Sequence, residues 1–375
     1  MRNALVLPSS GRGRGPEGWL VDGGVYGPRG REIRIARPAF EKAACSQPPA
    51  LRRDDLRPRR GRWLFGGWLQ PIFGHYLVFS MGHLWPLAAP GANYTGVVFQ
   101  GLTGPDLLER DHALRALLAC LGIGTRIPAI VAKEPMRFAH LTIGEPMRLG
   151  RPAAPARDAA FMALMRALAA SAPADDGLVL RGVYVSRSRL SNKGGFVLES
   201  VLEENLAAEG YAILHPERLS IPDQFAVYRA ARRVIFAEGT ALHLAIGALD
   251  PDIPVGVIAR RRPMIPAMRY YLEGAGMRRA ACVDAIRSVV TYGDGDRSVG
   301  GALANGLAVL DFEALRDGLV AAGLCRGTGW RIPTPAEVEA EIARAVEERQ
   351  KVWRKQRVAE IAINDFFPPP TAAPG

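Results

Sequence analysis

The fold is decided by four short apolar runs that alternate with helical patterns: LVLRGVYV at 178–185, YAIL at 211–214, VIFA at 234–237 and PVGVIA at 254–259. Between these runs, the pattern predicts a helix over 195–209, a helix from the capping sequence 220–223 to Arg232, and a helical turn over 240–249. Strands that alternate with helices over about 85 residues are typical of a parallel sheet wrapped by helices. The sequence therefore predicts an α/β domain in this region.

A second alternating pattern precedes the first. Strands are predicted at 63–65, 96–99 and 127–131, and helices at 74–87 and 103–121. The stretch SAPADDG at 171–177 is the best linker candidate between the two patterns. Since single hydrophobic cores stop growing at about 250–300 residues, a chain of 375 residues is also expected to form two domains.

The two ends of the chain show neither pattern. Residues 1–62 are rich in Gly, Pro and Arg, whereas Thr334, Pro335 and Glu337 have the spacing of a capped helix start. We therefore expect five segments: a basic irregular arm with a short strand at its start (1–62), an N-terminal α/β domain (63–176), a C-terminal α/β domain (177–330), a C-terminal helix (331–363) and a disordered tail (364–375).

Composition excludes several classes of protein. An apolar fraction of 48% and a charged fraction of 23% exclude wholesale disorder. No run approaches the ~18–20 apolar residues that span a bilayer, and the run 4–7 is too short for a signal-peptide core. The four cysteines lie far apart, without the spacing of metal ligands. A cytoplasmic protein without a structural metal is expected.

The net charge of +11 is concentrated at one end. Residues 1–62 carry 14 basic and 6 acidic side chains, or +8, which leaves +3 for the other residues. A solvated arm is the default interpretation of this bias. Contact of the arm with acidic lipid, and so a peripheral association with the inner face of the cell membrane, stays open, whereas nucleic acid is a disfavoured partner.

Two predicted strand ends carry groups that suit an anionic ligand. Ser186, Arg187 and Arg189 follow the first strand of the C-terminal domain, and the stretch EGTALH at 238–243 follows the third. In open α/β sheets, ligands bind beyond the carboxyl ends of the strands. Gly239 would allow close approach of the backbone, so these groups could together hold a diphosphate. The alternative is that the arginines are solvated and that Glu238 pairs with one of them.

The same stretches resemble glycosyltransferase family 61. SRSR at 186–189, HPE at 215–217 and VIFAEGTALH at 234–243 carry the resemblance, and FGHYL at 73–77 is similar to the N-terminal signature of that family. The resemblance covers about 63–260 and is strongest over 180–250. Bacterial members are usually described as capsular polysaccharide biosynthesis proteins.

The resemblance implies an α/β, GT-B-like fold with two Rossmann-like domains that face each other across a cleft. It implies an inverting transferase with an acceptor-side N-terminal domain and a C-terminal domain that holds a nucleotide sugar, UDP- or GDP-linked. The acceptor would be a glycan, and no cofactor is expected. The expected donor-binding residues are Ser186, Arg187, Arg189, Glu238, Gly239, Thr240 and His243.

The reaction needs a general base that takes a proton from the acceptor hydroxyl. His75 is the first candidate, because an unperturbed pKa of about 6.5 suits this task; the alternative is a hydrogen-bonded core histidine. Glu238 is the second catalytic candidate, with a contact to a donor-sugar hydroxyl as its other role, and His243 would either face the nucleotide or pack in its helix. Asp294 and Asp296 form a DxD, but their glycine-rich surroundings predict a turn, so no metal site is expected.

Two positions favour a second hypothesis. Members of the family tend to have Glu where this chain has Phe79, and Arg where it has His83. A non-catalytic glycan- or nucleotide-binding relative with the same fold is therefore the alternative function. A nucleic-acid binder that relies on the basic arm is a third hypothesis.

Overall fold

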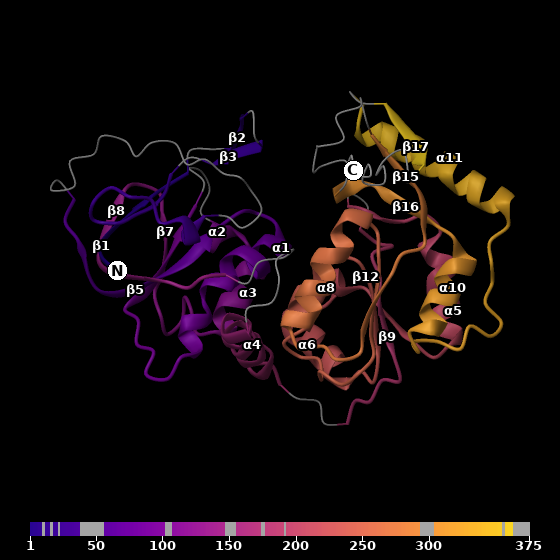
Figure 1. Cartoon of the computed structure of the whole chain (residues 1–375), viewed down its shortest axis with the longest axis horizontal. Helices are drawn as coiled ribbons and strands as arrows, with labels where there is room; N and C mark the ends of the chain where they lie inside the picture. Colours follow the sequence, from indigo (N-terminus) through magenta and orange to yellow (C-terminus); the bar gives the residue numbers. More distant parts are fainter. Residues whose placement is uncertain are drawn as a thin grey trace, which may run out of the picture. The chain divides into compact units, whose positions relative to one another are not determined.

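The computed structural model describes residues 1–9, 12–15, 18–21, 23–37, 56–101, 107–146, 155–173, 177–190, 193–292, 304–354 and 357–362. The chain divides into two compact units (Figure 1): unit 1 comprises Met1–Ala174 and His243–Ala248, and unit 2 comprises Asp175–Leu242 and Leu249–Gly375. Each unit contains a mixed α/β arrangement with parallel strands, as predicted.

The main sheet of unit 2 is parallel throughout. Its strands lie in the order β11-β9-β12-β13-β14. Their bounds are Ala212–Leu214 for β11, Val183–Val185 for β9, Val234–Ala237 for β12, Val255–Ile258 for β13 and Ala280–Val283 for β14. The predicted alternation is confirmed. Because the chain runs from β9 to β11 on one side and then crosses to β12 on the other, the strand order reverses between β9 and β12.

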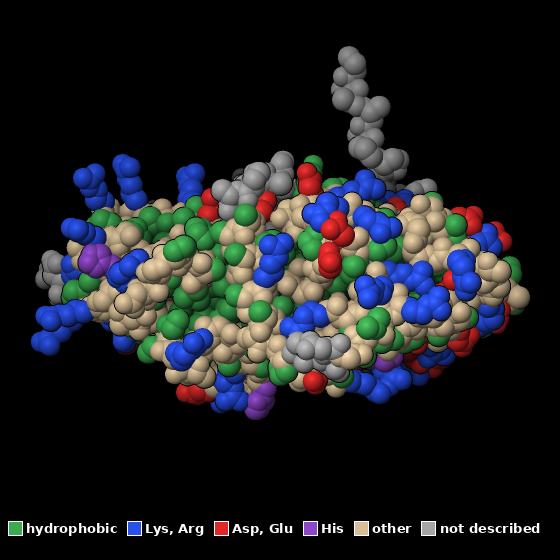
Figure 2. Space-filling model, turned by 90° about the horizontal axis from the view of Figure 1, so that it is seen from below, with side chains coloured by type: hydrophobic (Ala, Val, Ile, Leu, Met, Phe, Trp, Pro, Cys, Tyr) green, Lys and Arg blue, Asp and Glu red, His purple; other side chains and the backbone are tan. Residues whose placement is uncertain are grey.

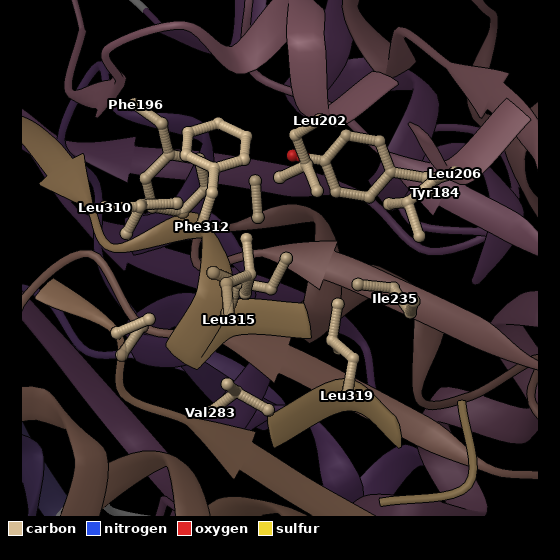
Figure 3. Packing of buried hydrophobic residues seen from close by; sticks show 14 of the residues in the cluster. Tyr184, Phe196, Leu202, Leu206, Ile235, Val283, Leu310, Phe312, Leu315 and Leu319 are labelled. Carbon is tan, nitrogen blue, oxygen red and sulfur yellow. The ribbon is translucent and has the colours of Figure 1, made fainter. Parts of the chain in front are cut away.

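Helices cover both faces of this sheet (Figure 1). Helices α5 (Glu199–Ala208) and α10 (Phe312–Ala321) pack on one face, where Leu202 and Leu315 lie in a single core with Ile235 of β12 (Figure 3). Helices α6 (Ile221–Ala230) and α8 (Ile265–Gly274) cover the other face. Phe236, the next residue of β12, packs there against Tyr228 of α6. Apolar side chains of β12 therefore alternate between the cores on the two faces of the sheet.

Unit 2 also contains a second, mixed sheet in the order β10-β16-β15-β17. Its strands are β10 (Gly195–Phe196), β16 (Leu307–Leu310), β15 (Ile286–Tyr292) and β17 (Val358–Ala362). Helix α11 (Pro335–Val352) packs on it through the cluster that includes Val338 and Ile342. The capping box predicted at Thr334 is confirmed.

Two helix predictions in unit 2 require correction. The helix expected over 195–209 begins only at Glu199, because Gly195–Phe196 instead pairs with β16. The helix expected over 331–363 ends at Val352, since the chain then turns back and pairs along β15 as β17. The tail predicted at 364–375 lies outside the described residues.

The sheet of unit 1 has the order β4-β1-β8-β5-β6-β7. The parallel strands are β5 (Arg59–Trp68), β6 (Gly96–Gln100), β7 (Ala129–Ala132) and β8 (Met136–Ile143), to which β1 (Arg2–Leu7) and β4 (Gly24–Tyr26) add antiparallel partners. Strands β2 (Arg12–Gly15) and β3 (Gly18–Val21) form a separate pair, and the helices are α2 (Leu107–Arg110), α3 (His112–Cys120) and α4 (Pro155–Ala170).

The irregular arm expected over 1–62 is therefore replaced, where the structure describes it, by strands of this sheet. The short strand expected at its start is present as β1, whose residues 4–7 are buried and paired on both sides. Lys and Arg side chains are spread over both units on the face shown in Figure 2, so basic surface is not confined to the N-terminal residues.

The helix predicted over 74–87 is broken into short pieces. These are α1 (Phe73–His75), the π-helical turn η3 (Tyr76–Ser80) and the 3₁₀ turns η4 (Met81–His83) and η5 (Trp85–Ala88). Pro86, at the start of η5, has no N–H group to continue an α-helical ladder. The broken segment directly follows β5, at the point where the strand order of unit 1 reverses between β5 and β8.

A buried carboxylate anchors the chain after α10. Glu209 Oε1 accepts hydrogen bonds from the backbone N–H of Arg326 (3.1 Å) and Gly327 (2.7 Å) and from the indole of Trp330 (3.3 Å). Burial would raise the pKa of Glu209, but the bonds from Arg326 and Gly327 outweigh it and lower the pKa. Its stabilisation is thus present above the usual Glu pKa of about 4.3 and is lost as the pH falls through the lower folded pKa.

Replacing Glu209 with alanine should destabilise the protein by about 2–3 kcal/mol, because several partly buried hydrogen bonds lose their acceptor. The matched control is Glu204→Ala, whose side chain is 66% exposed and 3.7 Å from Arg331; it should cost less than ~1 kcal/mol. Urea unfolding at neutral pH measures both. Equal losses for the two variants would contradict the anchoring role of Glu209.

Candidate functional site

Three adjacent strand ends meet at one edge of the main sheet of unit 2. Parallel strands bring their carboxyl ends to the same edge, so the residues after β9, β12 and β13 are neighbours there. They are Ser186–Arg187, Glu238–Gly239 and Arg260–Arg261. Ligands of open α/β sheets bind where the strand order reverses, which here is the gap between β9 and β12.

Arg187 and Gly239 are in direct contact across this gap. A methyl group at Gly239 would come within 2.4 Å of Nη1 of Arg187, so glycine is required for the guanidinium to lie there. Arg187 Nε donates to the carbonyl of Gly194 at 2.7 Å. Burial lowers the pKa of Arg187, which is the cost of holding a cation below the surface. The predicted proximity of these two residues is therefore present in the structure.

A buried carboxylate holds the turn that carries Arg187. Glu199, at the start of α5, is 4% exposed, and its Oε1 accepts from the Tyr184 hydroxyl at 2.9 Å and the Arg187 backbone N–H at 2.7 Å. Ser186 Oγ lies 3.1 Å from the same oxygen and 2.5 Å from Oε1 of Glu203. Burial raises the pKa of Glu199. Ser186 is itself fully buried, so within the described residues it belongs to the support of the turn.

Glu238 is engaged by the loop that follows β13. Its Oε2 accepts from the backbone N–H groups of Arg260 and Arg261, each at 2.8 Å, and its Oε1 accepts from Nε of Arg261 at 2.6 Å. The carboxylate is 1% exposed. Burial would raise the pKa of Glu238, but Arg261 and Arg260 outweigh it and lower the pKa. The alternative interpretation paired Glu238 with Arg187 or Arg189, whereas the structure pairs it with Arg261.

The other predicted donor-binding residues are Arg189, Thr240 and His243. Arg189 is exposed in the turn after Arg187, without a hydrogen bond or ion pair to the described residues. Thr240 is half-buried directly before α7 (Ala241–Ala245). His243 is buried within α7 and is grouped with unit 1. The structure therefore brings Ser186, Arg187, Glu238 and Gly239 together in unit 2 and does not group His243 with them.

In unit 1, His75 lies in α1, just beyond the carboxyl end of β5. Its Nδ1 is hydrogen-bonded to the side-chain oxygen of the buried Gln70. Because an amide oxygen only accepts, Nδ1 carries the proton and Nε2 carries the lone pair. The hydrogen bond of the alternative interpretation, a hydrogen-bonded core histidine, is therefore present, and the His75 side chain is half-buried.

His83 is the buried histidine of the same segment. It is 2% exposed, and its Nδ1 lies 2.7 Å from the carbonyl oxygen of Gly144, directly after β8. The side chain of Phe79 lies outside the described residues.

Sequence reasoning missed Glu199, Arg260 and Arg261. Three consecutive arginines, 260–262, follow the predicted strand 254–259, and this position at a strand end could have revealed them. Glu199 carries no such signal, since an acidic residue in the first turn of a helix is common. Within the part of the chain that the structure describes, no group of three or more His, Cys, Asp or Glu side chains is arranged to hold a metal ion. Asp294 and Asp296 lie outside that part.

None of the described helices combines the length and the apolar character that crossing a membrane requires.

Comparison with known proteins supplies one family. No curated protein matches the chain. Among solved structures, the crystal structure of the glycosyl transferase family 9 from Veillonella parvula DSM 2008 shows 9% sequence identity and a TM-score of 0.29, and the match covers 60% of this chain and 86% of that chain. The family model of Glycosyltransferase 61 matches residues 73–250. Over these residues, which include His75 in unit 1 and the Arg187 and Gly239 strand ends in unit 2, the chain is similar to glycosyltransferase family 61.

Proposed function

We propose that the protein is an inverting glycosyltransferase of capsular or other cell-surface polysaccharide biosynthesis. It transfers a sugar from a UDP- or GDP-linked donor to a glycan acceptor, without a metal ion or cofactor, in the cytoplasm or at the inner face of the cell membrane. The match of residues 73–250 to the family 61 model supports a sugar donor and an acceptor. The observation that carries the donor assignment is the contact of the Arg187 guanidinium with the backbone of Gly239 at the β9–β12 gap.

Arg187 suits the leaving group of this reaction. As the bond to the anomeric carbon breaks, negative charge grows on the departing nucleoside diphosphate, and a fixed guanidinium stabilises it. Nε of Arg187 is bound to Gly194, so the side chain is oriented before any ligand arrives. Within the described residues, no hydrogen-bond acceptor is paired with either Nη atom.

His75 suits the acceptor side. In an inverting step, the acceptor oxygen forms its bond to the anomeric carbon while the bond to the diphosphate breaks, and the hydroxyl proton passes to a base. Gln70 sets the tautomer that leaves the lone pair on Nε2 of His75. We assign this nitrogen as the acceptor of the proton.

Replacing Arg187 with alanine should weaken binding of UDP or GDP at least tenfold, a loss of ~1.4 kcal/mol. Calorimetry with a panel of UDP- and GDP-sugars identifies the donor and measures the loss. The matched control is Arg232→Ala, an exposed arginine before the amino end of β12, which should leave the affinity unchanged. Unchanged affinity in Arg187→Ala would contradict the assignment of the donor site to this edge of the sheet.

Replacing Gly239 with alanine should lower the affinity for the same nucleotide about tenfold with little loss of stability. This is the size of effect expected when one charged contact to the ligand is displaced. The added methyl group meets the flexible end of Arg187 rather than backbone, so the side chain moves and the fold is retained. Calorimetry and thermal unfolding, measured together, test this. A large fall in melting temperature with unchanged affinity would contradict it.

A second candidate is a non-catalytic relative that binds nucleotide or glycan. The observation in its favour is that His83, at a position where family members tend to have arginine, is buried and bonded to the Gly144 carbonyl. The two candidates differ in donor turnover. Release of nucleoside diphosphate from a sugar nucleotide by purified protein, abolished in His75→Ala, would eliminate the non-catalytic candidate.

A further inference from the structure

The guanidinium of Arg261 is held by one edge only. Its Nε donates to Oε1 of Glu238 at 2.6 Å, and Nη2 lies 2.5 Å from the same oxygen. Nη1 has no hydrogen-bond acceptor among the described residues, and the side chain is 21% exposed. A fork whose inner edge is bound to a carboxylate and whose outer edge faces solvent is oriented to receive an anion.

Arg187 presents its Nη atoms at the same edge of the sheet. It follows β9, Arg261 follows β13, and Gly239 at the end of β12 lies between them without a side chain. Adjacent strands are ~4.8 Å apart, so the two backbones are separated by roughly 10 Å, a span that two arginine side chains readily close. Burial lowers the pKa of Arg187, and the positive charge of Arg261 lowers it further, as expected of guanidiniums within electrostatic reach.

The neighbouring arginines are already occupied. Arg260 is buried and donates to the carbonyl of Ala304 at 3.0 Å. Arg262 pairs with Asp284 at 2.7 Å. Of the three consecutive arginines, Arg261 is therefore the one whose outer edge is available at this site.

We propose that Arg187 and Arg261 form a two-arginine clamp over Gly239 for the diphosphate of the donor, and that Glu238 is a positioning residue that holds Arg261. This proposal rests on the proposed function and adds a second phosphate ligand to it. Glu238 then acts through Arg261, instead of serving as the base or contacting the donor sugar. The local charge fits: among the described residues, Glu238 and Glu199 are the carboxylates that interact electrostatically with Arg187 and Arg260, and Arg261 pairs with Glu238, so a diphosphate would add negative charge beside three guanidiniums.

The test measures affinity for UDP, GDP, inorganic pyrophosphate, uridine and guanosine by calorimetry on the full chain. Arg261→Ala should lower the affinity for pyrophosphate, and for the nucleoside diphosphate that the wild type binds, at least tenfold. The affinity for the nucleoside should stay unchanged. Arg261→Lys keeps the charge without the fork and should recover only part of the loss. Arg262→Ala, next in sequence but paired with Asp284, is the control that should bind like the wild type.

A double-mutant cycle tests the role of Glu238. Glu238→Gln should weaken the diphosphate about tenfold and leave nucleoside affinity unchanged, a dependence on phosphate that a purely structural defect would not produce. In the Arg261→Ala background, Glu238→Gln should have a much smaller effect on diphosphate affinity, because the arginine that Glu238 holds by hydrogen bonds is gone. Additive losses would overturn the positioning role. If Glu238→Gln does not fold, Glu238→Asp takes its place in the cycle.

Failure of the clamp is distinguishable from failure of the proposed function. If Arg187→Ala weakens UDP or GDP and Arg261→Ala does not, the clamp is overturned and the donor site stands. If the wild type binds no nucleoside diphosphate or sugar nucleotide of the panel, both the clamp and the proposed function are overturned. Equal loss of diphosphate and nucleoside affinity in Arg261→Ala would also overturn the clamp, because a side chain that contacts only the diphosphate should not change the affinity for a nucleoside.

Discussion

Replacing His75 with alanine should lower the rate of donor turnover by about 10²–10⁴-fold, the contribution typical of a positioned general base. Nδ1 is bound to Gln70, so the imidazole is held in the tautomer that accepts a proton at Nε2. Release of nucleoside diphosphate from the sugar nucleotide measures this rate.

The control for this variant is His140→Ala in the same unit. His140 is exposed on β8, so its removal should leave turnover unchanged. Affinity for the nucleoside diphosphate should also be unchanged in His75→Ala, because the residues of the proposed donor site belong to unit 2. Undiminished turnover in His75→Ala would place the base on another residue.

The largest loss of stability is expected from Glu199→Ala, about 3–5 kcal/mol, the cost of removing one partner from a buried charged network. The change leaves the buried Tyr184 hydroxyl and the Arg187 backbone N–H without their acceptor and removes a carboxylate that faces the Arg187 guanidinium. The turn that carries Arg187 then loses its support. Urea unfolding measures the stability, and nucleotide affinity should fall in parallel.

The isosteric variant Glu199→Gln separates shape from charge. Its amide oxygen can still accept from Tyr184 and Arg187, so a smaller loss than in Glu199→Ala is expected. Burial raises the pKa of Glu199, so the folded protein binds this proton more tightly than the unfolded chain. The wild type should therefore lose stability relative to Glu199→Gln as the pH rises from about 4.3 through the folded pKa. A constant difference between the two proteins over this range would contradict the raised pKa.

Sequence patterns predicted those parts of the fold that depend on neighbouring residues. The strands ending at Val185, Leu214 and Ala237 show short apolar runs, and Ser220 and Thr334 begin helices as capping residues. These signals are local, because a cap or an apolar run acts within a few residues of itself. The resemblance to family 61 likewise used short stretches, and the same stretches lie within the region that the family model matches.

Pairing between distant segments was beyond these patterns. Strand β1 pairs with β8 more than a hundred residues away, and β17 pairs with β15 across the length of α10 and α11. The sequences of β1 and β17 are too short and irregular to indicate their pairing partners. The sequence therefore predicted an arm over residues 1–62 and a single helix over residues 331–363. Register depends on which face is buried, and that is decided only when the whole sheet is present.

The sequence by itself determined the α/β class, the strand ends that carry Arg187 and Gly239, and the stretches that resemble glycosyltransferase family 61. Only the tertiary structure decided which charges meet: Glu238 with Arg261, Glu199 with the Arg187 turn, and His75 with Gln70. The physical reason is that ion pairs and buried hydrogen bonds form between side chains that the topology of a sheet brings together, whatever their separation along the chain, whereas propensity and capping act over a single turn or strand.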